Sequence, residues 1–222
     1  MSDENLQSLY RHRFSSDELP RKAAIWKVLC EDFFQKFVDP SNDCVLDLAC
    51  GYGEFTNHIR ARRKIAVDLN PDSPNALEAG VEFHPVPANS LTPIPDGAVD
   101  VVFTSNFFEH LPDKNMLSDV LREVHRVLKP NGTLIAMGPN IKYVPGAYWD
   151  FIDHHLPLTE LSLTEALHIA GMEATTIIPR FLPYTTQSSL PQAPIFVKLF
   201  LKFPLAWRLL GKQFLVVSRK LP

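Results

Sequence analysis

A short apolar strand followed by a glycine-containing turn constrains the fold of this chain more than any other feature. Residues Cys44–Leu48 form the apolar stretch, and Ala49-Cys50-Gly51-Tyr52-Gly53 follows it directly. Glycine adopts backbone angles that other residues resist, and it lets the backbone approach a ligand closely. Residues 54–62 are predicted to form a helix after the turn. This order of elements is typical of a sheet that binds a nucleotide-like ligand at its strand ends.

Strands and helices alternate along the first 140 residues. The helix predicted over residues 114–128 has apolar residues on one face, and Lys129-Pro130-Asn131-Gly132 is expected to end it. Residues 21–38 are expected to form an earlier helix with a wide apolar stripe. Further strands are expected at residues 64–67, 81–86, 99–104 and 133–137. Such alternation predicts an α/β fold with a largely parallel sheet.

The last third of the chain has a different character. Residues 140–158 are rich in aromatic residues, Pro, Asp and His, which indicates a loop. Ser162 and Glu165 fit a capping box for a helix that ends near Gly171. Two more strands are predicted at residues 173–178 and 214–219. Between them, residues 195–210 are predicted to form a helical stretch broken at Pro204.

Composition excludes several classes of protein. The sequence contains no run of about 18 uncharged apolar residues, so no membrane-spanning helix is expected. The first residues lack the apolar segment of a secretory signal. Three cysteines without a C-x-x-C pair suit a reducing compartment. We therefore expect a cytoplasmic protein.

Charge is distributed unevenly along the chain. All 25 acidic residues lie at or before Glu173, and the last 49 residues carry seven basic residues and no acidic one. Residues 195–212 combine this positive charge with many apolar side chains. Such a segment suits peripheral contact with a membrane surface, a lid over an apolar acceptor, or a dimer face. The alternative is a helix packed on the sheet with its lysines in water.

Acidic residues near the turn indicate which ligand it binds. Asp68 follows Gly53 by 15 residues and ends the next strand, where it can accept hydrogen bonds from ribose hydroxyls. Thr56 occupies the third glycine position of the dinucleotide fingerprint, which is therefore incomplete. Asp47 would repel a pyrophosphate but could bind an ammonium group. These features favour a ligand with an amino acid at one end and a ribose at the other.

The same residues resemble motif I, D/E-x-x-x-G-x-G, of the class I S-adenosylmethionine-dependent methyltransferases. Ala66-Val67-Asp68 resembles the second motif of that family, and the run from Pro95 to Val102 resembles the stretch leading into its fourth strand. Glu109-His110-Leu111 and the run from Leu121 to Gly132 are similar to methyltransferases of the methyltransferase-11 type. The resemblance covers about residues 43–140.

The resemblance implies S-adenosylmethionine as the cofactor and a Rossmann-like, doubly wound seven-strand α/β sheet whose last two strands make an antiparallel edge. It implies one methyltransferase domain over residues 1–222, with an N-terminal helical cap (1–40), a cofactor-binding core (43–140) and an acceptor-side part (141–222). Arg13 is a further candidate for the methionine carboxylate, or a surface arginine. The other implied cofactor-binding residues are Asp47, Ala49, Gly51, Gly53, Asp68, Leu69, Asn89, Ser90, Ser105 and Asn106.

The acceptor side is expected in the loop after the fifth strand. Its aromatic residues can stack, and Asp150 and His154, together with His110, are the candidate catalytic residues. Asp153 and His155 are further possible general bases in the same loop. The histidines could instead be structural and bond backbone carbonyls. No metal site is expected, because the adjacent side chains of Asp153-His154-His155 rarely all face one ion.

The expected function is S-adenosylmethionine-dependent methyl transfer, by in-line displacement, to a small-molecule or a glycan- or lipid-linked acceptor. One alternative is a non-catalytic scaffold that binds S-adenosylmethionine, and another is an NAD-dependent oxidoreductase. No nucleic-acid partner is expected, because Thr104-Ser105-Asn106-Phe107-Phe108 stands where base-modifying enzymes carry Asn-Pro-Pro-Tyr. The protein could also be peripheral at the inner face of a membrane.

Overall fold

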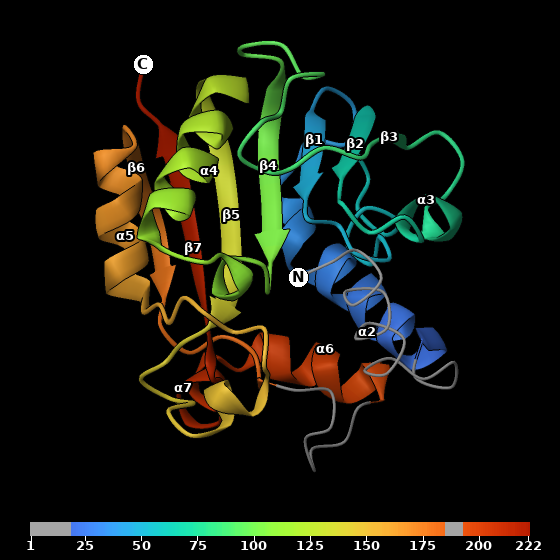
Figure 1. The fold of residues 1–222 in the computed structure, drawn as a ribbon. Coiled ribbons are helices and arrows are strands. Elements are labelled where there is room, and N and C mark those ends of the chain that lie inside the picture. Colours follow the sequence, from blue (N-terminus) through green and yellow to red (C-terminus); the bar gives the residue numbers. More distant parts are fainter. Residues whose placement is uncertain (1–18, 185–192) are drawn as a thin grey trace.

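The computed structural model describes residues 19–184 and 193–222, and a seven-stranded sheet runs through them (Figure 1). The strand order is β3-β2-β1-β4-β5-β7-β6. Strands β1 to β5 pair in parallel, whereas β7 is antiparallel to both β5 and β6. This confirms the predicted doubly wound sheet with an antiparallel edge. The strands are β1 (Cys44–Leu48), β2 (Arg63–Val67), β3 (Glu82–His84), β4 (Val99–Ser105), β5 (Leu128–Pro139), β6 (Met172–Ile178) and β7 (Gln213–Lys220).

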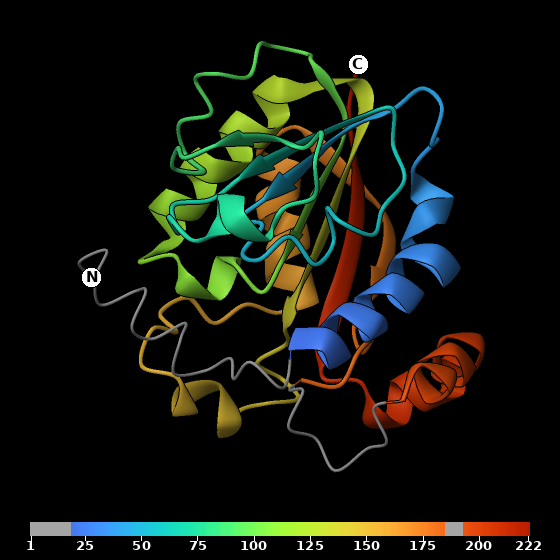
Figure 2. The ribbon, with the colours of Figure 1, turned by 90° about the vertical axis from the view of Figure 1, so that its right-hand side faces the viewer.

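Helices cover both faces of the sheet (Figure 2). On one face, α4 and α5 contribute apolar residues such as Leu121 and Leu163 to one core cluster, with α4 packed against β5 and α5 against β6 and β7. On the other face, α2 contributes Trp26 and Leu29 to an aromatic cluster. The helices are α2 (Leu19–Asp32), α3 (Ser73–Ala76), α4 (Lys114–Val127), α5 (Glu160–Ile169), α6 (Pro194–Lys202) and α7 (Pro204–Leu210), with 3₁₀ turns η1 (Phe34–Phe37), η2 (Phe108–His110) and η3 (Ala147–Asp150).

The helix predicted over residues 54–62 is wrong. The segment forms successive turns, in which Asn57 N–H donates to the Gly53 carbonyl (2.8 Å) and Ile59 N–H to that of Phe55 (2.9 Å). The Asn57 side chain bonds backbone groups of Ala76 (2.8 Å) and Glu78 (2.9 Å). Such side-chain bonds compete with a regular helix. The turn therefore leads into irregular chain rather than into a helix N-terminus.

Two helix ends also differ from prediction. Thr159, rather than Ser162, caps α5: the Thr159 hydroxyl accepts from Ser162 N–H (3.1 Å), and the Ser162 hydroxyl oxygen accepts from Thr159 N–H (2.9 Å). Helix α4 ends at Val127, and residues 129–132 already belong to β5. The run therefore follows α4 directly and is the first part of a strand, in which Asn131 takes a positive φ of 64°.

The predicted break at Pro204 is confirmed and separates α6 from α7. Helix α6 packs against α2, not directly on the sheet, with Leu201 buried between them and Lys198 Nζ 3.3 Å from an Asp32 carboxylate oxygen. In the described part of the chain, no helix has both the length and the apolar character needed to cross a membrane.

Candidate functional site

The sheet brings the predicted acidic residues together at one edge. Strands β2, β1 and β4 are neighbours and parallel, so their carboxyl ends meet. Asp47 pairs with Ala66 on one side and with Phe103 on the other, and Asp68 directly follows β2. Ligands of open α/β sheets bind at such strand ends.

The turn after β1 takes the left-handed conformation three times in five residues. Ala49 (φ 59°), Gly51 (φ 55°) and Gly53 (φ 75°) all have positive φ. A Cβ atom on Gly53 would also lie 2.5 Å from Leu77 Cδ2. Gly51 N–H donates to the Asp68 carboxylate (2.7 Å), which joins the turn to the end of β2. The positive φ favours glycine at position 53, and a larger residue there would also have to displace the Leu77 side chain.

Asp47 is a buried carboxylate with only 3% of its surface exposed. It accepts a hydrogen bond from the Thr56 hydroxyl, and Thr56 is held in turn by Lys64, whose Nζ donates to its carbonyl (2.8 Å). Burial, together with the nearby charges of Glu54 and Asp68, raises the pKa of Asp47 to about 7. A carboxylate in this setting is stabilised by a cation.

Asp68 is held by backbone donors on both carboxylate oxygens. Besides Gly51 N–H, Asn70 N–H donates to it at 2.7 Å. Burial raises the pKa of Asp68. Each carboxylate oxygen has a second lone pair, so the group can still accept from two hydroxyls. Leu69 follows it and is 55% exposed, so its side chain is available to a ligand.

Charged residues of α4 hold the loop that carries Asn89 and Ser90. The Arg126 guanidinium donates to the carbonyls of Leu91 and Ile94, both at 3.0 Å. Glu123 accepts from Leu91 N–H (2.7 Å). Both Asn89 and Ser90 are half-buried. The α4 motif therefore has a structural role, which is to position this loop.

Ser105 and Asn106 lie where β4 ends, as predicted. Ser105 is the last residue of the strand and is half-buried. Asn106 is exposed, has a φ of 50°, and donates its N–H to the Met137 carbonyl (2.9 Å). Arg13, the remaining cofactor candidate, lies outside the described residues.

The loop after β5 is fastened to η2 through the backbone of Glu109. His155 N–H (2.8 Å) and Leu156 N–H (3.1 Å) both donate to the Glu109 carbonyl. At the start of the loop, the Asn140 side chain donates to Glu160 of α5 (2.6 Å). These bonds place residues 153–156 beside His110. In Figure 1 the loop lies under the carboxyl ends of β4 and β5.

Two of the three candidate catalytic residues come together. The rings of His110 and His154 have centroids 5.0 Å apart. His110 Nδ1 lies 3.1 Å from an Asp153 carboxylate oxygen and 3.1 Å from its carbonyl. Burial lowers the pKa of His110, but Asp153 and Glu109 outweigh it, and the net shift is upward. Asp150 ends η3 and is exposed.

Sequence reasoning assigned no role at the site to Glu109 or Thr56, and it considered Asp153 only as a possible general base. Glu109 is buried beside His110, and burial raises its pKa to about 7. Asp153 orients His110, and Thr56 bonds Asp47. Glu109 is adjacent to His110 in the motif, and Asp153 is adjacent to His154. An acidic neighbour of each candidate histidine was the available signal.

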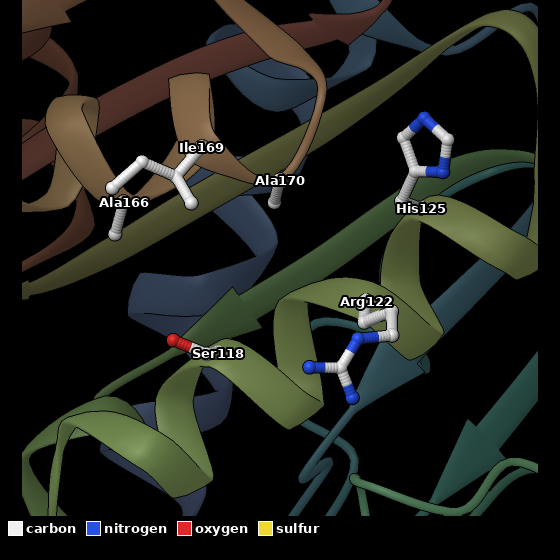
Figure 3. Close-up of a pocket in the computed structure, with 6 residues that line it drawn as sticks. All are labelled: Ser118, Arg122, His125, Ala166, Ile169 and Ala170. Carbon is white, nitrogen blue, oxygen red and sulfur yellow. The ribbon is translucent and has the colours of Figure 1, made fainter.

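A separate hollow lies between α4 and α5 (Figure 3). Its lining comes from these two helices and from Ala170, which follows α5 directly, and none of these residues follows a strand. The hollow therefore does not belong to the site at the strand ends. Its lining residues are Ser118, Arg122, His125, Ala166, Ile169 and Ala170.

Comparison with known proteins agrees with this geometry. Residues 46–136 match a family described as "Methyltransferase domain". A protein of Mycolicibacterium smegmatis named a probable S-adenosylmethionine-dependent methyltransferase is 33% identical over 135 residues, which are 58% of this chain and 51% of that protein. An uncharacterized methyltransferase of Schizosaccharomyces pombe is 30% identical over 132 residues, 55% of this chain and 50% of that protein. The chain spans about half the length of these curated relatives.

A solved structure shows the same fold over nearly the whole chain. The crystal structure of a SAM-dependent methyltransferase from Archaeoglobus fulgidus superposes with a TM-score of 0.66 and 21% identity. The match covers 96% of this chain and 99% of that one. Residues 46–136 thus match a methyltransferase domain family, and the chain has the fold of the class I S-adenosylmethionine-dependent methyltransferases.

Proposed function

We propose that the protein transfers the methyl group of S-adenosylmethionine to a small-molecule or a glycan- or lipid-linked acceptor. One observation carries this proposal: Asp47, Gly51 and Asp68 lie close together at the ends of adjacent parallel strands, within the matched domain. Asp47 and Gly51 would hold the methionine end, and Asp68 the ribose hydroxyls. The acceptor atom would attack the methyl carbon in line with its bond to sulfur, and S-adenosylhomocysteine would leave.

Electrostatics favours this cofactor over a dinucleotide. Burial of Asp47, together with the nearby charges of Glu54 and Asp68, raises its pKa, so a cation beside this carboxylate is favoured. The ammonium and sulfonium groups of S-adenosylmethionine supply one. A pyrophosphate would add negative charge beside the same carboxylates.

The proposed acceptor side is the cluster of His110 and His154, with Asp150 as a more exposed candidate. Holding the acceptor and the methyl donor in line supplies much of the acceleration. A group that takes the acceptor proton adds about 10²–10⁴-fold. Asp153 would keep His110 oriented for that role.

Titration calorimetry with S-adenosylhomocysteine and, separately, with NADH tests the cofactor assignment. We expect S-adenosylhomocysteine alone to bind, and Asp68→Ala to weaken it about 10- to 100-fold, because hydrogen bonds to a charged group contribute about 1.5–3 kcal/mol. Asp119→Ala, on α4 and away from the strand ends, is the matched control. Binding of NADH instead would contradict the proposal. A methyl-release assay with candidate acceptors then separates an enzyme from a non-catalytic scaffold.

We also propose that α6 and α7 contact the inner face of a membrane that presents a lipid-linked acceptor. Apolar side chains stay exposed on both helices, beside the basic residues Lys202 and Arg208. An amphipathic basic surface of this kind binds anionic lipid interfaces. The exposed apolar residues are Ile195, Phe196, Leu199, Phe203, Leu205, Leu209 and Leu210.

Liposome flotation tests the membrane contact. We expect the protein to float with vesicles that contain anionic lipid and to stay unbound with neutral vesicles. Leu205→Asp with Leu209→Asp should abolish flotation, because both side chains are exposed and the new charges resist burial in lipid. Ile152→Asp is the control, since it changes an exposed apolar residue of the loop after β5. Equal flotation of the double variant would contradict the proposal.

A further inference from the structure

Three side chains that commonly bind metals meet beside the loop after β5. Glu109 and His110 come from η2, and His154 comes from the loop. One ligand atom of each, a carboxylate oxygen or an imidazole nitrogen, lies within 4.8 Å of those of the other two. Glu109 and His154 are buried, and His110 is half-buried. Residues from two distant stretches of the sequence thus form the cluster that the run Asp153-His154-His155 could not form by itself.

Both histidines have a polar partner at Nδ1. His110 Nδ1 lies 3.1 Å from the carboxylate and 3.1 Å from the carbonyl of Asp153. The Tyr184 hydroxyl lies 3.4 Å from His154 Nδ1. A metal-bound histidine usually donates its second ring N–H to a carboxylate or carbonyl, which orients the ring and makes the other nitrogen the ligand. Asp153 has this relation to His110.

Buried polar groups beside the histidines point to a bound ligand. Glu109 is 5% exposed, so its carboxylate is buried beside the two histidines. The Tyr148 hydroxyl, which interacts electrostatically with Glu109, is buried and has no hydrogen-bond partner among residues 19–184 and 193–222. The Tyr148 ring centroid lies 4.7 Å from that of His154. Buried polar atoms nearly always have partners, and a cation with its own ligands would provide them.

We propose that Glu109, His110 and His154 bind one divalent transition-metal ion, with Asp153 as a positioning residue for His110. Two imidazoles and one carboxylate are a common protein ligand set for Zn²⁺ that leaves a coordination position for substrate. Bonds of ~2.1 Å to one tetrahedral ion put ligand atoms about 3.4 Å apart. Side-chain adjustments of about 1 Å close the present cluster to that spacing.

The proposed metal site lies on the acceptor side of the proposed active site. Only the role of the metal in methyl transfer rests on the proposed function, whereas metal binding itself does not. A divalent ion would bind an acceptor hydroxyl through its oxygen and lower the pKa of that hydroxyl. The proton leaves to solvent, an oxygen lone pair attacks the methyl carbon, and the carbon–sulfur electron pair returns to sulfur. The products are a methyl ether or ester and S-adenosylhomocysteine. The acceptor class is therefore a molecule with a hydroxyl or carboxyl group.

Metal titration of the chelator-treated full chain tests the site without any activity assay. Zn²⁺ is added in calorimetry, and Co²⁺ is added while its visible d–d absorption is recorded. We expect one ion per chain and a tetrahedral or five-coordinate cobalt spectrum. Glu109→Gln and His154→Ala should each weaken zinc binding at least tenfold and change the spectrum. Asp153→Asn should weaken it about 10- to 100-fold, and Asp153→Glu should restore part of the loss.

His155→Ala is the matched control, because His155 is adjacent to His154 but exposed and outside the cluster. Circular dichroism and S-adenosylhomocysteine binding establish that each variant is folded. The proposal is overturned if the wild type takes up no zinc, or if the two ligand variants bind zinc as the wild type does. If the wild type binds S-adenosylhomocysteine but no metal, only the metal-site proposal is contradicted. If it binds metal but no S-adenosylhomocysteine, the proposed cofactor is contradicted instead.

Discussion

Replacing Phe103 with alanine is expected to lower the free energy of unfolding by about 3–5 kcal/mol, the usual cost of removing a buried aromatic ring. Phe103 lies on β4 and is 1% exposed. Its ring stacks on Phe55 with centroids 3.7 Å apart, and it meets Trp26 and Phe34 edge-on at 6.0 and 5.1 Å. The space left by the ring cannot close easily, because its neighbours come from three different elements. Urea denaturation monitored by circular dichroism measures the loss.

The same substitution should weaken cofactor binding. Phe55 belongs to the irregular segment after the glycine turn, and its stack on Phe103 anchors that segment to the sheet. We expect S-adenosylhomocysteine affinity to fall in Phe103→Ala even where the protein is still folded. Phe203→Ala is the control, since Phe203 is exposed, and it should change stability by no more than about 0.5 kcal/mol. A loss below about 1 kcal/mol in Phe103→Ala would contradict this account of the core.

Local patterns were sufficient to predict most of the sheet. Short apolar runs bounded by Gly, Pro and Asp mark β1, β2 and β4, whereas the antiparallel edge made by β6 and β7 was implied by the family resemblance. The segment after Gly53 was mispredicted because its conformation depends on distant partners. Thr56 bonds Asp47, and Asn57 bonds the chain at Ala76 and Glu78. The local spacing of apolar residues does not indicate those contacts.

The cofactor side of the site could be predicted from local sequence, whereas the acceptor side depends on distant contacts. Asp47, Gly51 and Asp68 lie in or directly after strands, so a prediction of the strands also places them. His110 and His154 are joined only because backbone donors of the loop after β5 bind the Glu109 carbonyl. That contact requires the fold of residues 140–156, which no periodicity specifies. The burial of Glu109 and the contact of Asp153 with His110 became visible only with that fold.

Asp47→Asn is expected to have opposite effects on binding and on stability. The substitution removes the charge that would hold the cofactor ammonium group, so S-adenosylhomocysteine affinity should fall about 10- to 100-fold. Burial costs the ionised carboxylate free energy in the unliganded protein, whereas an amide avoids this cost and can still accept from the Thr56 hydroxyl. We therefore expect the unliganded variant to be more stable at pH 8 by at least about 1 kcal/mol, or about 2–4 °C in Tm.

The stability difference between Asp47→Asn and the wild type should depend on pH. The pKa of Asp47 is raised from 3.8 to about 7 in the folded protein, mainly by burial. Between these values the folded state binds a proton that the unfolded state has lost, so wild-type stability falls as the pH rises from about 4 to about 7. The advantage of Asp47→Asn should accordingly be full above pH 7 and shrink toward pH 4. Cofactor binding to the wild type should weaken below pH 7, where Asp47 takes up its proton, and this pH dependence should disappear in the variant.

Differential scanning calorimetry from pH 5 to pH 8, beside titration calorimetry at the same pH values, measures both effects. Asp119→Asn is the control: it makes the same chemical change at a half-exposed carboxylate of α4. It should alter neither the pH dependence nor the affinity. A variant Asp47→Asn that binds S-adenosylhomocysteine as the wild type does, and melts at a lower temperature at pH 8, would show that the carboxylate has a structural role and does not contact the cofactor. The predicted outcome would instead show that burial of the ionised Asp47 carboxylate lowers the stability of the unliganded protein, and that binding of the cofactor cation offsets this cost.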